Sequence, residues 1–320
     1  MVDRGFITCI SSEYREAHRS LIESRALTFE AVEENPYLNP AYVRSQLPLT
    51  LSLMFLGEWG EALREIEAAV AVLDKNGDDR WGQGVRPHRA WVHLLAMDFA
   101  GVLDQCDSAL RLIRDPEVHP APDYPAPYRF GLWKCLFLMG SAETGLGDYA
   151  SAQEHLLAAQ ADMNRPGPTC VWYWRLPLES ALTELWLAKG DLAQARPQAE
   201  RSLAIALATA EHTWQALAWE ANARLALAEL DLSRARECIA RGLSAMEGFE
   251  VPLAAWRVHA TAAELCQKSG DRDSAERHLA LSRDTIMKLA NSLPAREPLR
   301  QTFLSAPAVR RIQGKTAAAV

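Results

Sequence analysis

The chain has 320 residues, of which 49% are hydrophobic and 23% are charged, and its formal net charge is -7 at pH 7. An acidic chain without a basic patch is a poor match to a nucleic-acid backbone, which proteins usually bind through clustered lysine and arginine. Alanine and leucine dominate the hydrophobic residues and β-branched residues are sparse, which favours helices over strands, so we expect an all-α protein.

The first residues do not resemble a targeting segment. Residues 1–17 contain no basic start followed by an apolar run. Elsewhere, no segment reaches the ~18 uninterrupted apolar residues of a membrane span. We therefore expect a cytoplasmic protein without membrane contact.

A short motif recurs along the chain and indicates an internal repeat. The clear copies occupy residues 57–62, 147–152, 190–195 and 270–275, and weaker copies begin at Ser12, Met97 and Leu230. The seven copies follow one another in steps of 40 to 50 residues, which is typical of helix pairs. We predict that each copy is the turn between the first and second helix of a pair.

When the seven copies are aligned on their turn starts, two positions keep the same residue type, and we call them the acidic column and the small column. An acidic residue follows each turn start, where it can cap the second helix and complement its dipole. Four residues later a small residue indicates that two helices approach closely. The acidic column reads Glu13, Glu58, Asp98, Asp148, Asp191, Asp231 and Asp271. The small column reads Ala17, Ala62, Val102, Ala152, Ala195, Ala235 and Ala275.

The segment Gly147-Asp148-Tyr149, with Ala152 three residues further on, resembles the inter-helix turn and second helix of the tetratricopeptide repeat (TPR) family. The match extends over nearly the whole chain. Trp219 and the pair Met139-Gly140 also resemble that family's first helix, but most first helices depart from its pattern. The period is nearer 40 than the family's 34 or so residues. The resemblance implies a right-handed α-solenoid of about seven helix pairs.

The two ends of the array differ. Only residues 1–10 precede the first turn, so we expect a truncated first repeat whose apolar residues Phe6, Ile7 and Ile10 lie on an uncovered face. Such a face predicts a homodimer, or an upstream domain in a longer polypeptide. At the other end, residues 296–304 predict a closing helix. We expect the array to span residues 1–312, with a disordered tail at 313–320.

The closing stretch also carries a second resemblance. Residues 299–312 resemble the end of TPR arrays in bacterial signalling ATPases, cyclases and transcriptional regulators. Between the repeats, residues 115–128 contain five prolines, which exclude a helix interior and predict a surface loop. This loop is either a lip that contacts a partner or a tolerated insertion. Residues 165–168 predict a second connection of this kind.

No motif for catalysis, cofactor binding or metal binding is present. The six cysteines form no C-x-x-C pair, which favours buried free thiols, and the closest histidines, His88 and His93, do not share a helical face. Gly314-Lys315-Thr316 lacks the earlier glycine of a phosphate loop. The regular carboxylates are explained as helix caps. We therefore expect no enzyme, no cofactor and no metal.

The first helices of the pairs should line a concave groove if the TPR resemblance holds. Residues off the packing columns then project into the groove, and the aromatic cluster at 172–174 faces several directions, so that one ring lies near the surface. The candidate partner-binding residues are Arg44, Trp91, Lys134, Trp172, Trp174, Glu184, Glu220, Arg224, Arg257 and Glu264. This mixed set does not reproduce the Lys/Asn/Arg carboxylate clamp of chaperone-binding TPR proteins.

Two functions agree with these features. The leading hypothesis is a non-catalytic scaffold that binds a protein or peptide in the groove and belongs to, or partners with, a bacterial signalling or regulatory protein. The alternative is a small-molecule-sensing TPR effector domain that changes shape or self-association when its ligand binds.

Overall fold

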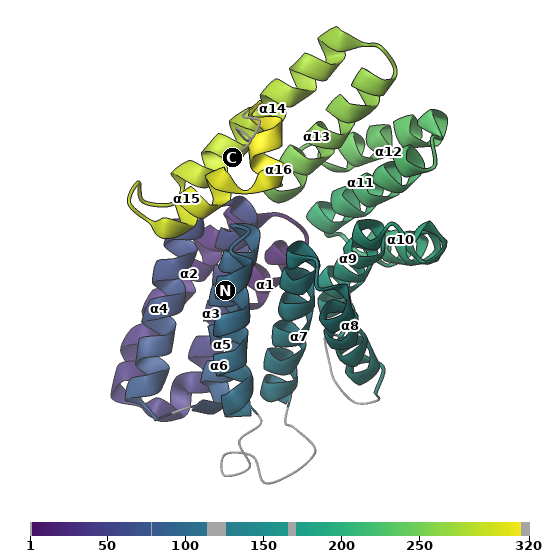
Figure 1. The fold of residues 1–320 in the computed structure, drawn as a ribbon. Coiled ribbons are helices and arrows are strands. Elements are labelled where there is room, and N and C mark those ends of the chain that lie inside the picture. Colours follow the sequence, from purple (N-terminus) through teal and green to yellow (C-terminus); the bar gives the residue numbers. More distant parts are fainter. Residues whose placement is uncertain (1, 78, 114–125, 166–170, 315–320) are drawn as a thin grey trace.

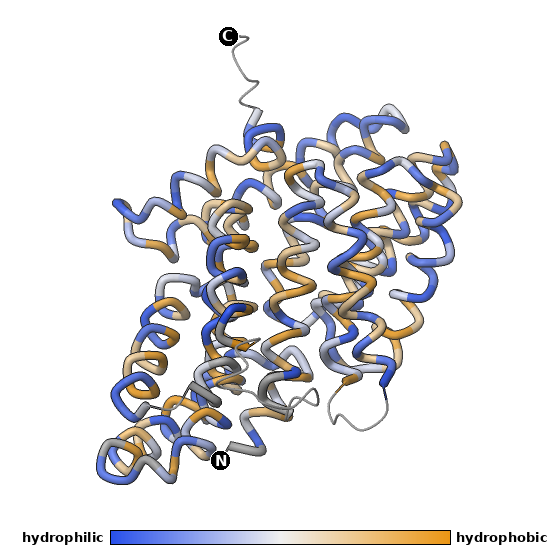
Figure 2. Tube along the Cα trace, turned by 60° about the horizontal axis from the view of Figure 1, so that its bottom comes forward, coloured by the Kyte–Doolittle hydropathy of each residue, from blue (hydrophilic) through white to orange (hydrophobic). Residues whose placement is uncertain are grey.

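The computed structural model describes residues 2–77, 79–113, 126–165 and 171–314. Within these ranges every regular element is a helix, with sixteen α-helices and one short 3-10 helix (Figure 1). Hydrophobic and hydrophilic residues alternate along the helices, as amphipathic helices packed in layers require (Figure 2). The expectation of an all-α solenoid is confirmed.

Fourteen of the helices form seven successive pairs. The first helices are α1 (Val2–Cys9), α3 (Asn39–Leu56), α5 (Asp79–Leu95), α7 (Ala126–Leu146), α9 (Val171–Lys189), α11 (His212–Ala228) and α13 (Pro252–Lys268). The second helices are α2 (Tyr14–Glu34), α4 (Trp59–Lys75), α6 (Phe99–Ile113), α8 (Tyr149–Met163), α10 (Leu192–Leu207), α12 (Leu232–Ala245) and α14 (Arg272–Asn291). The 3-10 helix η1 (Pro36–Leu38) joins α2 to α3, and the chain ends with α15 (Pro298–Ser305) and α16 (Pro307–Ile312).

All seven predicted turns are present, and each contains one residue in the left-handed region. Four of these residues are glycines, at positions 57, 147, 190 and 270. The other three are Ser12 (φ 59°), Met97 (φ 59°) and Leu230 (φ 63°), which are the weaker copies of the motif. Side chains at positive φ cost roughly 1–2 kcal/mol each, so the fold enforces the turn where glycine is missing.

The acidic column caps the second helices only where it is aspartate. The carboxylates of Asp98, Asp148, Asp191, Asp231 and Asp271 each accept a hydrogen bond from a backbone N–H three residues later, at 2.9 to 3.2 Å. Glu13 and Glu58 make no such bond. Their extra methylene moves the carboxylate out of capping geometry, so these glutamates act on the helix through charge alone.

The small column lies between packed helices, as predicted. All of its seven residues are buried, from Ala17 in α2 to Ala275 in α14. Each first helix packs on the second helix of its own pair, and each except α13 also packs on the first helix of the next pair. The largest buried cluster joins the N-terminal repeats to α13–α16, and three smaller clusters lie around α11.

The last helices return to the second repeat, which closes the superhelix on itself (Figure 1). The Trp59 ring at the start of α4 packs edge-on against Phe303 of α15, with ring centroids 5.0 Å apart. The Trp59 backbone N–H donates to Ser292 Oγ at 3.1 Å. Gly60 lies so close to the Ser292 carbonyl oxygen that a Cβ would collide with it. The predicted closing helix therefore caps α14 and also joins the two ends of the array.

A second contact across the ring joins the first turn to α11. Glu211 is fully buried, and its carboxylate accepts hydrogen bonds from the hydroxyls of Ser12 (3.1 Å) and Tyr14 (2.7 Å). The Tyr14 hydroxyl also lies 2.7 Å from Thr213 Oγ1. Nearby, Arg15 forms an ion pair with Glu250 at 2.6 Å. The first repeat is thus held against the sixth.

The three apolar residues predicted for the N-terminal face are described, whereas the predicted loops and the tail lie largely outside the described residues. Ile7 of α1 is 59% exposed, whereas Phe6 and Ile10 are only partly exposed, so Ile7 is the main apolar residue of the N-terminal face. Residues 114–125, 166–170 and 315–320 lie outside the described residues, and with them most of both predicted loops, Cys170 and the tail. The five other cysteines are free thiols. None of the described helices has the length and apolar character needed to cross a membrane.

Candidate functional site

Aromatic residues fill the interior of the N-terminal repeats. Phe55 of α3 packs on Trp91 of α5 (5.7 Å between ring centroids) and on Trp214 of α11 (5.9 Å). Trp91 also packs on Phe137 (5.2 Å) and on Trp174 (6.3 Å). The side chains of Trp91 and Trp174 are buried. The expectation that these two tryptophans project into an open groove is therefore wrong, because the closed superhelix packs its first helices against one another.

Lys134 of α7 is also buried in this interior. Its ammonium donates to the carbonyl oxygen of Gly84, lies 3.2 Å from His88 Nε2, and sits 4.9 Å from the centre of the Trp174 ring. No carboxylate among the described residues neutralises it. Burial lowers the pKa of Lys134 to about 7. The predicted groove residue Lys134 is therefore part of the core, out of a partner's reach.

Four other candidates come together on the C-terminal first helices. Arg224 of α11 donates two hydrogen bonds to Glu184 of α9, at 2.8 and 2.9 Å. Arg257 of α13 pairs with Glu184 and, at 3.2 Å, with Glu220. Glu220 also accepts a hydrogen bond from the Thr261 hydroxyl, at 2.8 Å. We call Glu184, Glu220, Arg224 and Arg257, with Glu264, the charge ladder.

The charge ladder follows the repeat. Glu184, Arg224 and Glu264 each lie six residues before a turn start, so one position alternates in sign over three successive first helices. Glu220 is buried, but the side chains of the other members are accessible, from 26% for Arg257 to 54% for Glu264. Among the described residues Glu264 forms one ion pair, with Lys268 on its own helix at 3.7 Å. The ladder is therefore an accessible charged surface with Glu264 as its least restrained member.

The two arginines of the ladder hold Glu184 in its charged form. Burial alone would raise the pKa of Glu184, but Arg224 and Arg257 outweigh it and lower that pKa to about 2. The Glu184 carboxylate in turn raises the pKa of Arg224. Glu184 therefore stays ionised over the physiological pH range and keeps its ion pairs with Arg224 and Arg257.

The two remaining candidates stand apart from both groups. Arg44 is exposed on α3. Trp172, at the start of α9, is 42% exposed and packs edge-on against Tyr173 at 5.8 Å. This confirms that one ring of the aromatic cluster at 172–174 reaches the surface while Tyr173 and Trp174 are buried.

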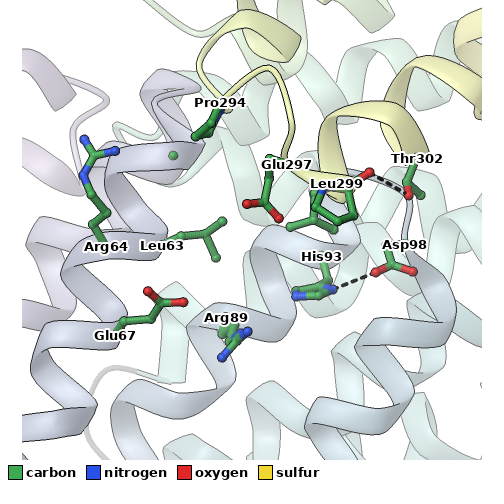
Figure 3. A pocket seen from close by; sticks show the side chains of 12 residues that line it. Leu63, Arg64, Glu67, Arg89, His93, Asp98, Pro294, Glu297, Leu299 and Thr302 are labelled. Carbon is green, nitrogen blue, oxygen red and sulfur yellow. Dashed lines mark hydrogen bonds and ion pairs between the residues drawn. The ribbon is translucent and has the colours of Figure 1, made fainter.

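A surface pocket of about 390 Å³ lies at the junction of the two ends of the array, and we call it the seam pocket (Figure 3). One wall comes from α4 and α5, with Leu63, Arg64, Glu67 and Arg89. The opposite wall comes from the loop before α15 and from α15 itself, with Pro294, Glu297, Pro298, Leu299 and Thr302. His93 and Asp98 line one end and lie 2.8 Å apart.

Sequence reasoning missed the seam pocket because its walls come from repeats far apart in the chain. One local signal was present. Trp59-Gly60 stands at a turn where the other clear copies have Tyr149-Ala150, Leu192-Ala193 and Arg272-Asp273. A large ring followed by a residue without a side chain is typical of a backbone that another segment approaches closely.

Comparisons with known proteins find distant structural similarity and no match in sequence. No protein-family model matches the chain, and no curated protein is significantly similar to it in sequence. The solved structure of BtubC (BKLC) from P. vanneervenii is similar with 12% identity and a TM-score of 0.46, over 89% of this chain and 95% of that one. PilW, described as a widely conserved type IV pilus biogenesis factor, has 15% identity and a TM-score of 0.46, over 82% and 98%.

The described residues show which class of architecture this is. Seven helix pairs with recurrent left-handed turns, aspartate caps and a buried small column fit a TPR-like helical repeat superfamily. Among the described residues no group of three or more His, Cys, Asp or Glu side chains is arranged to hold a metal ion.

Proposed function

We propose that the chain is a non-catalytic scaffold module that binds a protein partner along the charge ladder, as part of, or partner to, a bacterial signalling or regulatory protein. The observation that carries the proposal is the alternation of Glu184, Arg224 and Glu264 at one repeat position on three neighbouring helices. The ionisable residues of the aromatic interior, in contrast, are buried and bonded within the core. The link to signalling rests on the resemblance of residues 299–312.

The spacing of the ladder suggests the form of the partner. Packed helices lie ~10 Å apart, and an extended chain covers this distance in about three residues. An extended segment with a basic residue near Glu184, an acidic residue near Arg224 and a basic residue near Glu264 matches the alternation. Since Glu184 and Arg224 already neutralise each other, the contact to Glu264 contributes most, and electrostatic complementarity mainly sets specificity.

The test is affinity capture from a lysate, followed by quantitative mass spectrometry of proteins and small molecules. The bait is the wild type, the variant Glu264→Lys, or the matched control Glu237→Lys, which makes the same charge change at an exposed site on α12. We expect one protein to be retained by the wild type and the control and to be reduced roughly tenfold by Glu264→Lys. A binding segment from that protein should then bind purified wild type directly.

Two results contradict the proposal. Equal retention of the same proteins by all three baits removes the ladder as the binding surface. Retention of a small molecule without a protein supports the alternative, a small-molecule-sensing effector.

A further inference from the structure

The seam pocket contains charged side chains without a partner among the described residues. The guanidinium groups of Arg64 and Arg89 and the carboxylates of Glu67 and Glu297 form no ion pair or side-chain hydrogen bond with the described residues. In the charge ladder, by comparison, every arginine is paired. Unpaired charges that converge on a concave site are available to a ligand.

The free charges of the two walls lie around Leu63. Figure 3 shows Leu63 between Arg64 of one wall and Glu297 of the other, with Glu67 and Arg89 beside one another below it. Leu299 is buried, and Pro294 and Pro298 stiffen the wall above it. Asp98 is already engaged, because its carboxylate contacts His93 and caps α6 at the Gly101 N–H. The four free charges thus surround an apolar centre.

We propose that the seam pocket binds a short peptide segment that carries an acidic and a basic side chain on either side of an apolar residue. The acidic group binds Arg64, the basic group binds Glu297 on the opposite wall, and the apolar side chain covers Leu63 between them. A volume of about 390 Å³ is at the lower end of ligand pockets and suits two or three residues. A free amino acid reaches fewer of these charges, since its own charges lie on neighbouring atoms.

Such a ligand also stabilises the closed form of the superhelix. Its two walls belong to α4 and α5 on one side and to the loop before α15 on the other, so the site exists only when the superhelix is closed. A ligand that binds only the closed form stabilises that form in proportion to its occupancy. Binding at the seam is independent of the charge ladder, which lies on α9, α11 and α13.

Isothermal titration calorimetry with blocked tripeptides tests this proposal. The probes are acetyl-Glu-Leu-Lys-amide and acetyl-Lys-Leu-Glu-amide, with acetyl-Gln-Leu-Gln-amide, free lysine and free glutamate for comparison. We expect one charged tripeptide to bind and the uncharged one to fail. The double variant Arg64→Gln, Arg89→Gln should weaken binding by at least roughly tenfold. The double variant Arg236→Gln, Arg272→Gln changes the charge equally at exposed sites on α12 and α14 and should bind as the wild type does.

A third variant tests the dependence on closure. Phe303 does not line the pocket but holds α15 against Trp59, so Phe303→Ala should weaken the tripeptide although every charged group remains. Equal binding to the wild type and to Arg64→Gln, Arg89→Gln would overturn the site, as would no binding of either charged tripeptide. Free amino acids that bind as tightly as the tripeptides would overturn the assignment to a peptide.

Discussion

The first helices of the two halves of the array use the same repeat position in opposite ways. Six residues before the turn start, the second and third repeats place Leu51 and Trp91 in the buried interior, whereas Phe6 and Ser141 of the first and fourth repeats are partly exposed. The C-terminal repeats place Glu184, Arg224 and Glu264 there, where they remain accessible. A position in a repeat therefore has no fixed role, because closure of the superhelix decides which first helices become core and which remain surface.

The largest effect should come from opening the contact that closes the ring. Trp59 is buried against Phe303, so Trp59→Ala removes a large core side chain and should cost about 3–5 kcal/mol of unfolding free energy. Trp172→Ala, at a 42% exposed tryptophan, should cost less than about 1 kcal/mol. Urea denaturation measures both variants. If Trp59→Ala and Trp172→Ala cost the same, the seam does not hold the N-terminal half closed.

The contact between the first turn and α11 should make stability depend on pH. The groups that face Glu211 are Ser12, Tyr14, Thr213, Cys9 and Tyr173, and none of them is a cation. Burial raises the pKa of Glu211 from 4.5 to about 8, more than its hydrogen bonds lower it. Between these values the unfolded chain has lost the proton that the folded chain keeps, so the contribution of Glu211 to stability falls as the pH rises from about 4.5 to 8.

The variant Glu211→Gln keeps the neutral form at every pH. Relative to the wild type it should gain about 1–3 kcal/mol between pH 5.5 and pH 7.5, since each unit of pKa shift corresponds to about 1.4 kcal/mol. Thermal or urea unfolding at the two pH values measures the change. The variant Glu237→Gln, at an exposed site on α12, is the control and should show no such difference. A constant difference for Glu211→Gln would mean that Glu211 is ionised in the folded protein.

A backbone substitution at the seam should have a smaller effect. Gly60→Ala places a Cβ against the Ser292 carbonyl oxygen and should cost about 1–2 kcal/mol, although alanine is the better helix former. Gly84→Ala is the matched control, because the nearest atom to its Cβ is Leu47 Cδ1 at 3.9 Å. This control should be neutral or slightly stabilising. Destabilisation by Gly84→Ala alone would show that the approach of the two ends is not the constraint.

The sequence predicts local structure well in this protein because local structure depends on short patterns. All seven turn starts were predicted, including Met97 and Leu230, since the acidic and small columns that follow them keep their spacing. The exposure of first-helix residues was not predictable in the same way. Lys134 and Arg257 stand at the same distance before their turn starts, yet one is buried and the other accessible. That difference arises from packing between repeats, since Lys134 is enclosed by Gly84, His88 and Trp174 of other first helices.

The smallest effect should come from removing an ion pair of the charge ladder. The size of the coupling energy and its salt dependence distinguish a surface ion-pair network from a buried one. A double-mutant cycle on Glu184→Gln and Arg224→Gln should give a coupling energy of about 0.5–1 kcal/mol, because partly exposed ion pairs are screened by solvent. The coupling should decrease when the salt concentration rises from 0.1 M to about 1 M, where the Debye length falls to about 3 Å. The cost of Trp59→Ala should not show this decrease, since burial of an aromatic ring does not depend on screening. A ladder coupling above about 3 kcal/mol that is insensitive to salt would place the ladder in the core of the protein and would contradict its role as a binding surface.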